Sequence, residues 1–417
     1  MKYIVKAPDT LRQPLSIGLP ASKSLSNRAL VMQGLCHDHC RLTNLSDCDD
    51  TRVMLAAFDT DPSHHTFSAD GARIIDIGAA GTSMRFLTAY FASREGAEVV
   101  MTGSERMRQR PIALLVDALR QLGASIDYAE AEGFPPLRIH GCQLQGGALT
   151  IDGSVSSQYI SALLMNAPTL SEGLRLTLSG NVTSKPYIEM TLSMLREFGI
   201  VSTWDHVAQL ISIAPQAYQA HDYHVESDWS AASYWYEIAA LAGCQISPSG
   251  ITLEGLHRES LQGDSAIARH FAALASHTGQ TFCLDLTTEP DLAQTLITTC
   301  CALGIPFRIT GLHTLRIKET DRVAALEQEL RKLGYVVMDR NVGPTIEMAW
   351  DGTRSEAEPT PVIATYKDHR MAMAFAPLAL VQSGRSIVID DPAVVSKSYP
   401  HFWDDLQRAG FQVEEIL

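Results

Sequence analysis

This sequence has fewer basic than acidic residues. Its 417 residues include 33 Lys and Arg against 47 Asp and Glu, which gives a formal net charge of −14 at pH 7. A protein that binds a nucleic-acid backbone or an anionic membrane surface needs a basic face. Neither class of partner is therefore expected, and any place where cations gather becomes informative.

Long apolar runs are also missing. No segment approaches the roughly 20 residues of a membrane-spanning helix. The start, MKYIVKAPDT, has neither the apolar stretch of a signal peptide nor the Arg and Ser of a transit peptide. We therefore expect a cytoplasmic protein. Hydrophobic residues still make up 46% of the chain, and its length predicts two or three globular domains.

Cysteine is present without a regular pattern. The eight cysteines are unevenly spaced in a chain that shows no secretory signal, so buried free thiols are expected. The segment CHDHC, residues 36–40, could be a metal site, because it holds two Cys and two His. However, no second ligand pair follows at zinc-finger spacing, and such close ligands would strain one tetrahedral site. A surface loop after the first helix is favoured.

Several familiar catalytic motifs are absent. The sequence has no GxxxxGK[ST] phosphate loop, no HExxH, no GxSxG and no dinucleotide fingerprint. Nucleotide-driven and hydride-transfer chemistries are therefore not favoured.

Four segments share one pattern and indicate internal duplication. Each reads as the end of an amphipathic helix, a Gly at the position of a left-handed cap, and then β-formers. The segments are DALRQLGASI from Asp117, SMLREFGIVS from Ser193, QELRKLGYVV from Gln328 and DDLQRAGFQV from Asp404. Helix, Gly cap and strand is common in α/β proteins, but the repeated Leu-x-x-x-Gly ending favours duplicated α/β modules packed into larger domains.

The opening cation motif is LPASKSLSNRAL, residues 19–30. Ser22 or Ser24 is expected to cap a helix, and Ser24 shares a face with Arg28. A helix N-terminus offers unpaired N–H groups and a positive dipole end, so with Lys23 and Arg28 it suits a phosphate or carboxylate. The alternative is an ordinary capped helix with solvated cations.

Four more motifs in the N-terminal half repeat this theme. IGAAGTSMRFL, residues 77–87, places small residues before an apolar helix, where backbone amides can approach an anion. SERMRQRP, residues 104–111, brings three Arg together before a Pro that suits a first helical turn. GSVSSQYISALL, residues 153–164, and SKPYIEM, residues 184–190, add serines at helix starts. Together they indicate a substrate with more than one anionic group.

The second half supplies acids and further cations. In LRIKETDRVAALEQELRKLG, residues 315–334, Lys318 and Arg322 stand at i and i+4 and are expected to face one cleft, with Glu319 one step round. Asp291 follows Pro290 at an expected helix start. TYKDHRMAMAFAPLAL places Asp368, His369 and Arg370 in the first turn of an apolar helix, and VSKSYP adds Lys397. The alternative is a set of surface ion pairs, each worth little.

Nine motifs, in order along residues 20–400, resemble the 5-enolpyruvylshikimate-3-phosphate (EPSP) synthases. They are PASKSLSNRAL, GAAGTSMR, TGSERMRQRPI, GSVSSQYISALLM, SKPYIEMTL, EPDLAQTL, RIKETDR, DHRMAM and SKSYP. The resemblance implies an α/β chain of two domains with inverted architecture, each built from three βαβαββ-type units. It implies one domain over residues 19–224 and the other over 1–18 and 225–417, with the active site in the cleft between them.

The resemblance also implies the reaction. The enolpyruvyl group of phosphoenolpyruvate would move to the 5-hydroxyl of shikimate 3-phosphate, with release of phosphate and without a metal or organic cofactor. The implied ligands of shikimate 3-phosphate are Lys23, Ser24, Arg28, Ser156, Ser157, Gln158, Ser184, Tyr187, Asp291 and Lys318. Those of phosphoenolpyruvate are Lys23, Gly81, Arg110, Gln158, Arg322, Arg370 and Lys397.

The implied catalytic residues are Asp291, Glu319 and Lys23. Asp291 would take the proton of the attacking hydroxyl, Glu319 would carry the proton to and from the methylene carbon, and Lys23 would share in proton transfer. We expect a monomer that binds only these small molecules.

Three residues depart from the family pattern: Ala79 and Thr314 replace Asn, and Phe86 replaces Pro. None is a charged group, so we expect activity to be retained, with altered affinity for phosphoenolpyruvate and an altered response to the inhibitor glyphosate.

Two other functions stay open. A UDP-N-acetylglucosamine enolpyruvyl transferase shares the fold and the donor, but its cysteine-bearing loop has no counterpart in SERMRQRP. A non-catalytic anion-binding relative would have lost acids and bases of the kind that Lys23, Asp291 and Glu319 supply.

Overall fold

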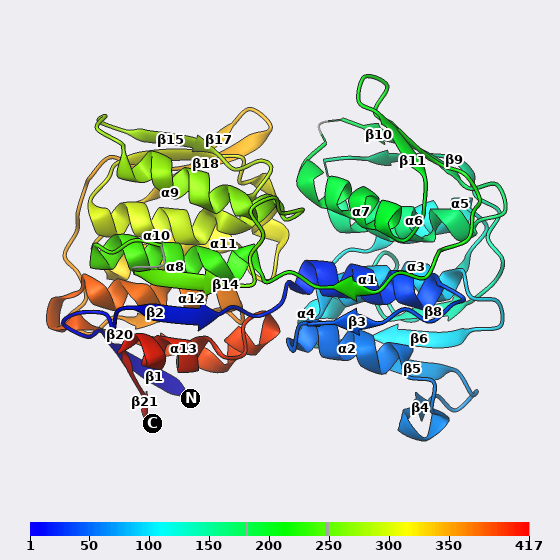
Figure 1. Cartoon of the computed structure of the whole chain (residues 1–417), viewed down its shortest axis with the longest axis horizontal. Helices are drawn as coiled ribbons and strands as arrows, with labels where there is room; N and C mark the ends of the chain where they lie inside the picture. The colour runs from blue at the N-terminus through cyan, green and yellow to red at the C-terminus, as the bar shows by residue number, and fades with distance from the viewer. Residues whose placement is uncertain (155, 181, 247–249, 417) are drawn as a thin grey trace. The chain divides into compact units, whose positions relative to one another are not determined.

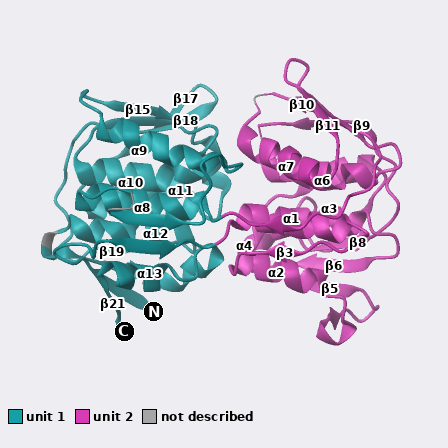
Figure 2. Cartoon of the chain, in the orientation of Figure 1, with its two compact units in different colours: residues 1–20, 227–417 teal, residues 21–226 magenta. Residues whose placement is uncertain are grey.

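The computed structural model describes residues 1–154, 156–180, 182–246 and 250–416. Val155, which belongs to the serine-rich motif at 153–164, lies outside the described residues. The chain divides into two compact units, shown in Figure 2: unit 1 is residues 1–20 with 227–417, and unit 2 is residues 21–226. Each unit has its own sheets and helices (Figure 1).

The described strands of unit 1 form three sheets. The first has the order β19-β20-β1-β21, the second pairs β14 with β2 in parallel, and the third has the order β15-β16-β18-β17. The strands are β1 (Lys2–Lys6), β2 (Leu15–Gly18), β14 (Ile251–Glu254), β15 (Phe282–Asp285), β16 (Phe307–Thr310), β17 (Met338–Val342), β18 (Thr345–Trp350), β19 (Val362–Ile363), β20 (Ser386–Asp390) and β21 (Gln412–Ile416).

The N-terminal strand β1 lies in the interior of its sheet. It runs antiparallel to β20 on one side, with Tyr3 opposite Ile389, and antiparallel to β21 on the other, with Tyr3 opposite Glu415. Every backbone group of a central strand takes part in a ladder. The first strand of the chain is therefore held between two of its last strands.

The helices of unit 1 lie between its sheets in Figure 1 and form the core. Every residue of α10 from Ala293 to Cys301 is buried, and α8 packs against it. Because its side chains are buried on all sides, with Gln294 and three threonines among them, α10 is an interior helix. The helices are α8 (Trp229–Ala242), α9 (Ile267–Ala275), α10 (Ala293–Leu303), α11 (Arg322–Lys332), α12 (His369–Phe375) and α13 (Phe402–Ala409), with 3-10 turns η3 (Gly263–Ala266), η4 (Pro290–Leu292), η5 (His313–Ile317), η6 (Ala376–Leu380), η7 (Ser383–Arg385) and η8 (Pro392–Lys397).

Unit 2 also has three sheets among its described residues. Their orders are β4-β5-β6-β8-β7, β11-β12-β10-β9 and β13-β3. The strands are β3 (Leu42–Thr43), β4 (Thr66–Phe67), β5 (Arg73–Asp76), β6 (Glu98–Thr102), β7 (Ser125–Tyr128), β8 (Leu137–His140), β9 (Gly147–Asp152), β10 (Leu174–Ser179), β11 (Ser202–Asp205), β12 (Leu210–Ile213) and β13 (Tyr223–His224). Along β10 every second side chain is buried, as expected for a strand with one covered face.

The helices of unit 2 position its polar motifs. They are α1 (Lys23–Leu35), α2 (Asp49–Phe58), α3 (Gly81–Ala92), α4 (Glu105–Arg108), α5 (Ala113–Gln121), α6 (Ser157–Asn166) and α7 (Lys185–Glu197), with 3-10 turns η1 (Pro62–His64) and η2 (Ala167–Thr169). Helices α1, α3, α6 and α7 pack against one another. Residues 36–40 follow α1 without regular structure, and their three central side chains are exposed, which confirms the predicted surface loop.

The repeated helix endings are confirmed. Gly123, Gly199, Gly334 and Gly410 all have positive φ, between 79° and 109°. Each follows a helix and precedes a strand: α5 and β7, α7 and β11, α11 and β17, α13 and β21. Only glycine adopts this conformation without steric cost, so the sequence signal had a direct physical cause.

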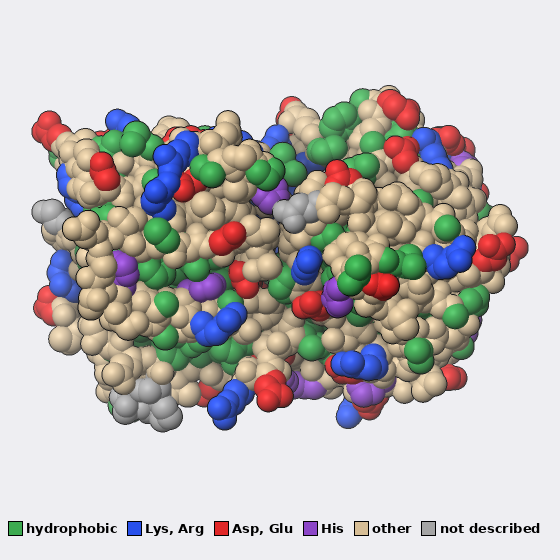
Figure 3. Space-filling model, turned by 90° about the horizontal axis from the view of Figure 1, so that it is seen from above, with side chains coloured by type: hydrophobic (Ala, Val, Ile, Leu, Met, Phe, Trp, Pro, Cys, Tyr) green, Lys and Arg blue, Asp and Glu red, His purple; other side chains and the backbone are tan. Residues whose placement is uncertain are grey.

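One face of the molecule is mixed in charge, and none of the described helices is of the membrane-spanning kind. On the face seen in Figure 3, acidic and basic side chains alternate without a large field of one sign. Within the described residues, no helix is both long enough and apolar enough to cross a bilayer.

Candidate active site

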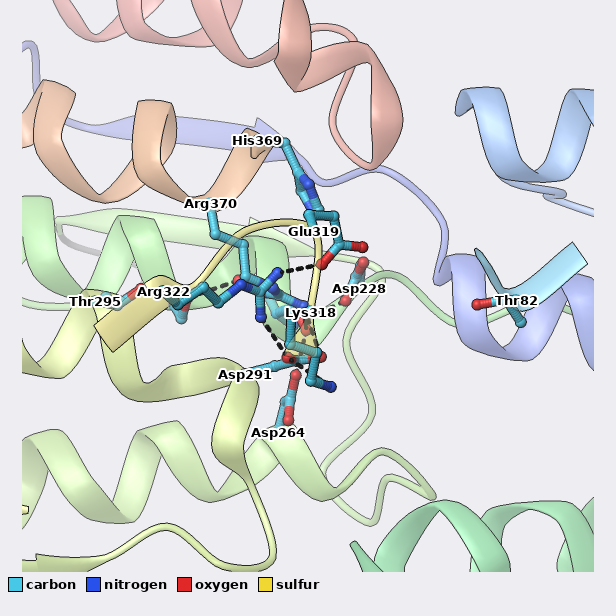
Figure 4. Close-up of polar contacts among 12 residues, drawn as sticks. Thr82, Asp228, Asp264, Asp291, Thr295, Lys318, Glu319, Arg322, His369 and Arg370 are labelled. Atoms are coloured by element: carbon cyan, nitrogen blue, oxygen red, sulfur yellow. Dashed lines mark hydrogen bonds and ion pairs between the residues drawn. The ribbon is translucent and has the colours of Figure 1, made fainter. Parts of the chain in front are cut away.

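A cluster of charged side chains in unit 1 is centred on Arg322. Its Nε donates to Asp368 Oδ2 at 2.7 Å, its Nη1 to Asp291 Oδ1 at 2.9 Å and its Nη2 to Glu319 Oε2 at 3.0 Å (Figure 4). The Arg322 side chain is only 2% exposed. The planar fork of an arginine presents several N–H donors in fixed directions. It therefore fixes three carboxylates relative to one another.

Three further cations contact the same carboxylates. Arg370 Nη2 lies 3.1 Å from Asp291 Oδ2, and Lys318 Nζ lies 3.5 Å from Asp291 Oδ1. Lys397 Nζ lies 3.0 Å from Glu319 Oε1. We call the seven residues the ion cluster: Lys318, Arg322, Arg370, Lys397, Asp291, Glu319 and Asp368. Its four cations exceed its three carboxylates, so a bound anion would not meet a net negative charge.

Helix caps position the ion cluster. Asp321 caps α11 by accepting from Ala324 N at 3.1 Å, which makes Arg322 the first helical residue. Asp368 caps α12 in the same way, by accepting from Arg370 N at 3.0 Å. Asp291 lies in η4, which leads into α10. Capping Asp side chains at helix starts are favoured because they satisfy free N–H groups. The two caps thus place Arg322 and Asp368 at the starts of α11 and α12.

A strained turn precedes α12. Tyr366 and Lys367 have φ of +54° and +59°, a region that costs a non-glycine residue about 1–3 kcal/mol. Buried Glu329 of α11 holds the turn, because its Oε1 accepts from Tyr366 Oη at 2.6 Å and its Oε2 accepts from Ala364 N at 3.0 Å. The turn that delivers Asp368 is therefore fastened to the helix that begins with Arg322.

The ion cluster keeps Asp291 charged. Burial by itself would raise the pKa of the Asp291 carboxyl, but Arg370, Lys318 and Arg322 outweigh burial and hold its pKa well below the usual range. Burial would lower the pKa of Arg322, yet Asp368, Glu319 and Asp291 raise it. The site therefore presents an ionised carboxylate among cations that an anionic ligand can bind.

In unit 2, Arg28 occupies a buried position within the helices. Its Nε donates to Thr191 Oγ1 at 2.8 Å and its Nη2 to Ser161 Oγ at 3.0 Å. Its Nη1 donates to Ser24 O at 2.9 Å. Burial lowers its pKa to about 10, so it stays charged at neutral pH. Its described hydrogen-bond partners are neutral oxygens, so the charge of Arg28 remains available to a nearby anion.

Gly81 begins α3 directly beneath two guanidinium groups. A Cβ added at Gly81 would lie 2.6 Å from Arg110 Nη1 and 2.8 Å from Arg85 Nη1. Arg85 Nη1 donates to Gly81 O at 2.6 Å. The absence of a side chain thus allows Arg110 to lie over the N–H groups of the helix start, where an anion is stabilised.

Serines and a glutamine begin α6 and α7. Ser156 caps α6 by accepting from Gln158 N at 3.3 Å, and Gln158 Nε2 donates to Thr82 Oγ1 of α3 at 3.1 Å. Ser184, before α7, has a left-handed backbone with φ of +52° and makes no capping hydrogen bond with its side chain. Its hydroxyl is therefore not used to cap the helix that it precedes.

The N-termini of four helices meet in unit 2. Gln158 joins the starts of α6 and α3, while Arg28 of α1 contacts Tyr187 O in the first turn of α7 at 3.4 Å. Arg28 also contacts Ser161 of α6. Positive helix ends that converge favour anions together. We call this region the helix-start site; it contains Lys23, Ser24, Arg28, Gly81, Arg110, Ser156, Ser157, Gln158, Ser184 and Tyr187.

The helical spacing assumed for Lys318 and Arg322 is wrong, because α11 begins only at Arg322 and Lys318 has an extended backbone. Both side chains nevertheless contact Asp291, so they lie at one site as expected. The expected place of Pro111 in a first helical turn is wrong, since α5 begins at Ala113. Within SERMRQRP, the side chain of Arg108 pairs with the exposed side chain of Glu130, at 3.1 Å.

Ser230, Tyr234 and Asp264 are neighbours of the ion cluster that the sequence does not mark as site residues. Arg370 Nη1 donates to Tyr234 Oη and its Nη2 to Ser230 Oγ, both at 3.4 Å. Ser230 and Tyr234 stand four apart on α8, a spacing that places them on one face. This spacing is the one signal that could have linked them. Asp264 stands alone in a loop and carries no such signal.

The three departures from the family pattern have distinct surroundings. Phe86 is buried, and its ring centroid lies 5.3 Å from Arg28 Cζ, a cation–π contact. Thr314 is buried in η5, and its hydroxyl has no hydrogen-bond partner among the described residues. Ala79 is exposed. Through this contact with Arg28, Phe86 touches the helix-start site described above.

No metal centre is formed by the described residues: none of their groups of three or more His, Cys, Asp and Glu side chains is arranged to hold an ion. The ion cluster and the helix-start site are instead suited to multiply charged anions.

Comparison with known proteins identifies the family. The family model of EPSP synthase (3-phosphoshikimate 1-carboxyvinyltransferase) matches residues 8–406. A 3-phosphoshikimate 1-carboxyvinyltransferase of Bacteroides fragilis (strain YCH46) is 50% identical, over 99% of both chains. One of Edwardsiella ictaluri is 39% identical, over 93% of this chain and 94% of its own. An EPSP synthase structure from Acinetobacter baumannii, 21% identical, covers both chains fully with a TM-score of 0.75, which shows the two-domain inverted α/β fold. The chain belongs to the EPSP synthase family.

Proposed function

We propose that this protein transfers the enolpyruvyl group of phosphoenolpyruvate to the 5-hydroxyl of shikimate 3-phosphate and releases phosphate, the enolpyruvyl-transfer step of aromatic amino acid biosynthesis. The observation that supports this most directly is the ion cluster, in which Arg322 holds Asp291 and Glu319 at 2.9 and 3.0 Å. This cluster combines cations for an anionic substrate with two carboxylates for proton transfer.

The acceptor, shikimate 3-phosphate, is assigned to residues of both units. The helix-start site would hold its phosphate and hydroxyls through Lys23, Ser24, Arg28, Ser156, Ser157, Gln158, Ser184 and Tyr187. From unit 1, Asp291 and Lys318 would take its ring hydroxyls. The serines, of which Ser24 and Ser156 are half-buried and Ser157 and Ser184 are buried, and the charge of Arg28 support this assignment, since a phosphate binds well to hydroxyls and N–H groups at helix starts.

The donor, phosphoenolpyruvate, carries a phosphate and a carboxylate. Arg322, Arg370 and Lys397 of the ion cluster would bind it, together with Lys23, Gly81, Arg110 and Gln158 of the helix-start site. Arg110 is suited to this role, because its guanidinium lies within 2.6 Å of the place where a Gly81 Cβ would be. The proposal therefore requires both units to contribute to both substrates.

Proton transfer follows from the chemistry of the enol group. For the addition, Glu319 must be a protonated acid, and it takes up a proton when the bound donor draws Arg322 and Lys397 away from it. The 5-hydroxyl then adds to C2 of the donor and gives up its proton to Asp291, while C3 receives a proton from Glu319 and becomes a methyl group. The tetrahedral intermediate next loses a proton from C3 to Glu319 and expels phosphate, which takes up the proton that Asp291 holds. Lys23 would share in proton transfer and stabilise the departing phosphate.

The ion pairs of Asp291 set its strength as a base. Its cationic partners hold its pKa well below the usual range, so the carboxylate is a weak base while those pairs are intact. An anionic donor that binds Arg370 and Arg322 would compete for these cations. The pKa of Asp291 would then rise toward the value that proton abstraction needs.

The decisive experiment measures product formation with two acceptors. Purified protein is incubated with phosphoenolpyruvate and either shikimate 3-phosphate or UDP-N-acetylglucosamine, and phosphate release is followed together with product mass. We expect release only with shikimate 3-phosphate. Release only with the nucleotide sugar would identify the other transferase, and release with neither would identify a non-catalytic relative. Asp291→Ala or Glu319→Ala with undiminished turnover would refute the assigned roles.

The monomeric state and the cytoplasmic location expected from the sequence stay predictions. The small-molecule substrates are part of the proposal.

A further inference from the structure

Asp264 is a buried carboxylate next to the ion cluster that the proposed mechanism leaves unused. It lies in η3 of unit 1 and is 4% exposed. One of its oxygens, Oδ2, shares a short hydrogen bond with Ser230 Oγ. The other, Oδ1, is buried without a hydrogen-bond partner among the described residues. Figure 4 shows the Asp264 side chain pointing toward Asp291.

A chain of contacts leads from Asp264 to the ion cluster. Ser230 Oγ accepts from Arg370 Nη2 at 3.4 Å, and the same Nη2 lies 3.1 Å from Asp291 Oδ2. Ser230 is fixed in turn, because its backbone N donates to the capping Asp228 Oδ1 at 2.8 Å. The position of Ser230 Oγ therefore helps to set the direction in which Arg370 points.

The loop that carries Asp264 is fastened to the start of α8. Gln262 Nε2 donates to Ser227 O at 2.8 Å, and Trp229 N donates to Gln262 Oε1 at 3.2 Å. Both contacts join the loop to the helix on which Ser230 stands. Asp264 is thus held against Ser230 by the backbone of its own loop as well as by its side chain.

The charge of Asp264 depends on its neighbours. The charged groups that act on it are Asp228 at the start of α8, Asp291 in η4 and Arg370 in α12. Burial, followed by the negative charge of Asp291, raises the pKa of Asp264 to about 7, against the opposing effect of Arg370. Below that pH the group is a neutral acid, and above it a further carboxylate stands beside Arg370.

We propose that Asp264 is a positioning residue for the donor site, which acts through Ser230 on the side chain of Arg370. The inference rests on the proposed function, because it assumes that Arg370 binds phosphoenolpyruvate. When Asp264 is a neutral acid, the positive charge of Arg370 is balanced only by Asp291 and by the bound donor. When Asp264 is ionised, its negative charge partly neutralises Arg370, to which it is linked through Ser230, and it repels the anionic donor.

The test compares pH profiles of the wild type and Asp264→Asn between pH 6 and 9. In the wild type we expect the KM for phosphoenolpyruvate to rise by about fivefold over this range, because a like charge beside an anion weakens its binding. In Asp264→Asn that rise should be absent. The phosphate of the donor itself titrates near pH 6, and the comparison of the two proteins cancels this contribution.

Two further variants sharpen the result. Ser230→Ala breaks the link and should also flatten the KM profile, while Asp404→Asn, the same change on a 73% exposed side chain of α13, should leave it as in the wild type. Asp264→Ala should raise the KM for phosphoenolpyruvate by a larger factor than it changes kcat. A KM profile of Asp264→Asn that follows the wild type would overturn the proposal.

A spectroscopic measurement separates this proposal from the enzymatic one. The infrared difference spectrum between pH 6 and 9 should contain a band of a protonated carboxylic acid that is missing in Asp264→Asn. Loss of that band supports the inference even if the wild type releases no phosphate, an outcome that would sink only the proposed function. An unchanged difference spectrum in Asp264→Asn would count against the inference itself.

Discussion

At the scale of single residues, Arg322 fixes the relative positions of the three carboxylates of the ion cluster. It is 2% exposed, and Asp368, one of its partners, is fully buried. A buried charge that loses its partner costs far more than an exposed one, because the desolvation of the remaining group is no longer offset. Arg322 is thus a structural residue as well as a ligand.

We expect Arg322→Lys to lower both stability and activity. A lysine has one charged nitrogen and cannot serve three carboxylates at once, so the free energy of unfolding should fall by about 3 kcal/mol and kcat/KM by about 100-fold. Chemical denaturation and phosphate release measure the two effects. Arg316→Lys is the matched control, since Arg316 is 37% exposed and should cost under about 1 kcal/mol. Equal losses in the two variants would contradict this role.

Acid should remove the stabilisation that Asp291 provides. Its pKa is lowered by folding, so the stabilisation is fully present above the unfolded-state pKa of about 4 and disappears as the pH falls through the folded value. Asp291→Asn should therefore be less stable than the wild type at pH 7, and the gap should narrow below about pH 4. Denaturant midpoints at several pH values measure the gap. A constant gap would show that Asp291 owes its effect to packing.

Lys23→Met should separate charge from shape. The methionine keeps the apolar stem of the lysine and removes the ammonium group. Because Lys23 is the first residue of α1 and only half-buried, we expect an unchanged circular dichroism spectrum and a loss of turnover of about 100-fold or more. Turnover within a few-fold of the wild type would remove Lys23 from the assigned catalytic residues.

The residues of the site differ in how visible they are in the sequence. Lys23, Arg28, Asp291 and Arg322 stand in dense motifs with caps and cations, and such motifs have local physical causes. Asp264 reaches the ion cluster only because a loop folds back onto α8. Contacts that depend on tertiary packing leave no local signal, which is why sequence reasoning could not find it.

At the scale of elements, the starts of helices carry the polar groups of both sites. α1, α3, α6 and α7 bring their N-termini together in unit 2, whereas Asp321 and Asp368 cap α11 and α12 in unit 1. The ends of helices were predictable, since Gly at a left-handed cap is a strong signal. The start of α11 was not, because the helical pattern of α11 extends back into RIKETDR and only the Asp321 cap sets where the helix begins.

A single methyl group at Gly81 should disturb the start of α3. The added Cβ would meet Arg110 and Arg85 side-chain nitrogens at 2.6 and 2.8 Å. These are the far ends of flexible side chains, so Gly81→Ala should change the free energy of unfolding by no more than about 1 kcal/mol. The KM for phosphoenolpyruvate should rise by about tenfold or more, because Arg110 must move.

Gly18→Ala is the matched control for this change. The nearest atom to its added Cβ is 4.0 Å away, on Glu254, so both stability and kinetics should stay near the wild type. Unchanged kinetics in Gly81→Ala would mean that Arg110 does not hold the donor from this position.

At the scale of the whole molecule, each unit is stabilised by its own core, and unit 1 is built from two ends of the chain. Strand β1 lies between β20 and β21, while β21 is an edge strand. The number of sheets and their order could not be predicted from the sequence, because β1 finds partners nearly 400 residues away and long-range pairing has no local signature.

Truncation should show the difference between a central and an edge strand. Removal of residues 1–6 deletes β1, which leaves β21 without a ladder partner and β20 with only the two-residue strand β19, so we expect unit 1 to lose its cooperative unfolding transition. Removal of residues 412–417 deletes the edge strand β21, leaves the buried Phe411 in place, and should lower the melting temperature while the transition remains. Calorimetry distinguishes the two. A sharp transition after removal of β1 would show that this strand is dispensable.

The place of β1 in its sheet also bears on the order of folding during synthesis. Unit 2 is one continuous stretch, residues 21–226, so its synthesis is complete while residues 227–417, which belong to unit 1, are still to be made. Lys2 pairs with Asp390 and Ile416, so β1 must wait through nearly all of translation for both partners. The nascent protein should therefore carry a folded unit 2 behind an unpaired N-terminal strand, which is when chaperones would act on it.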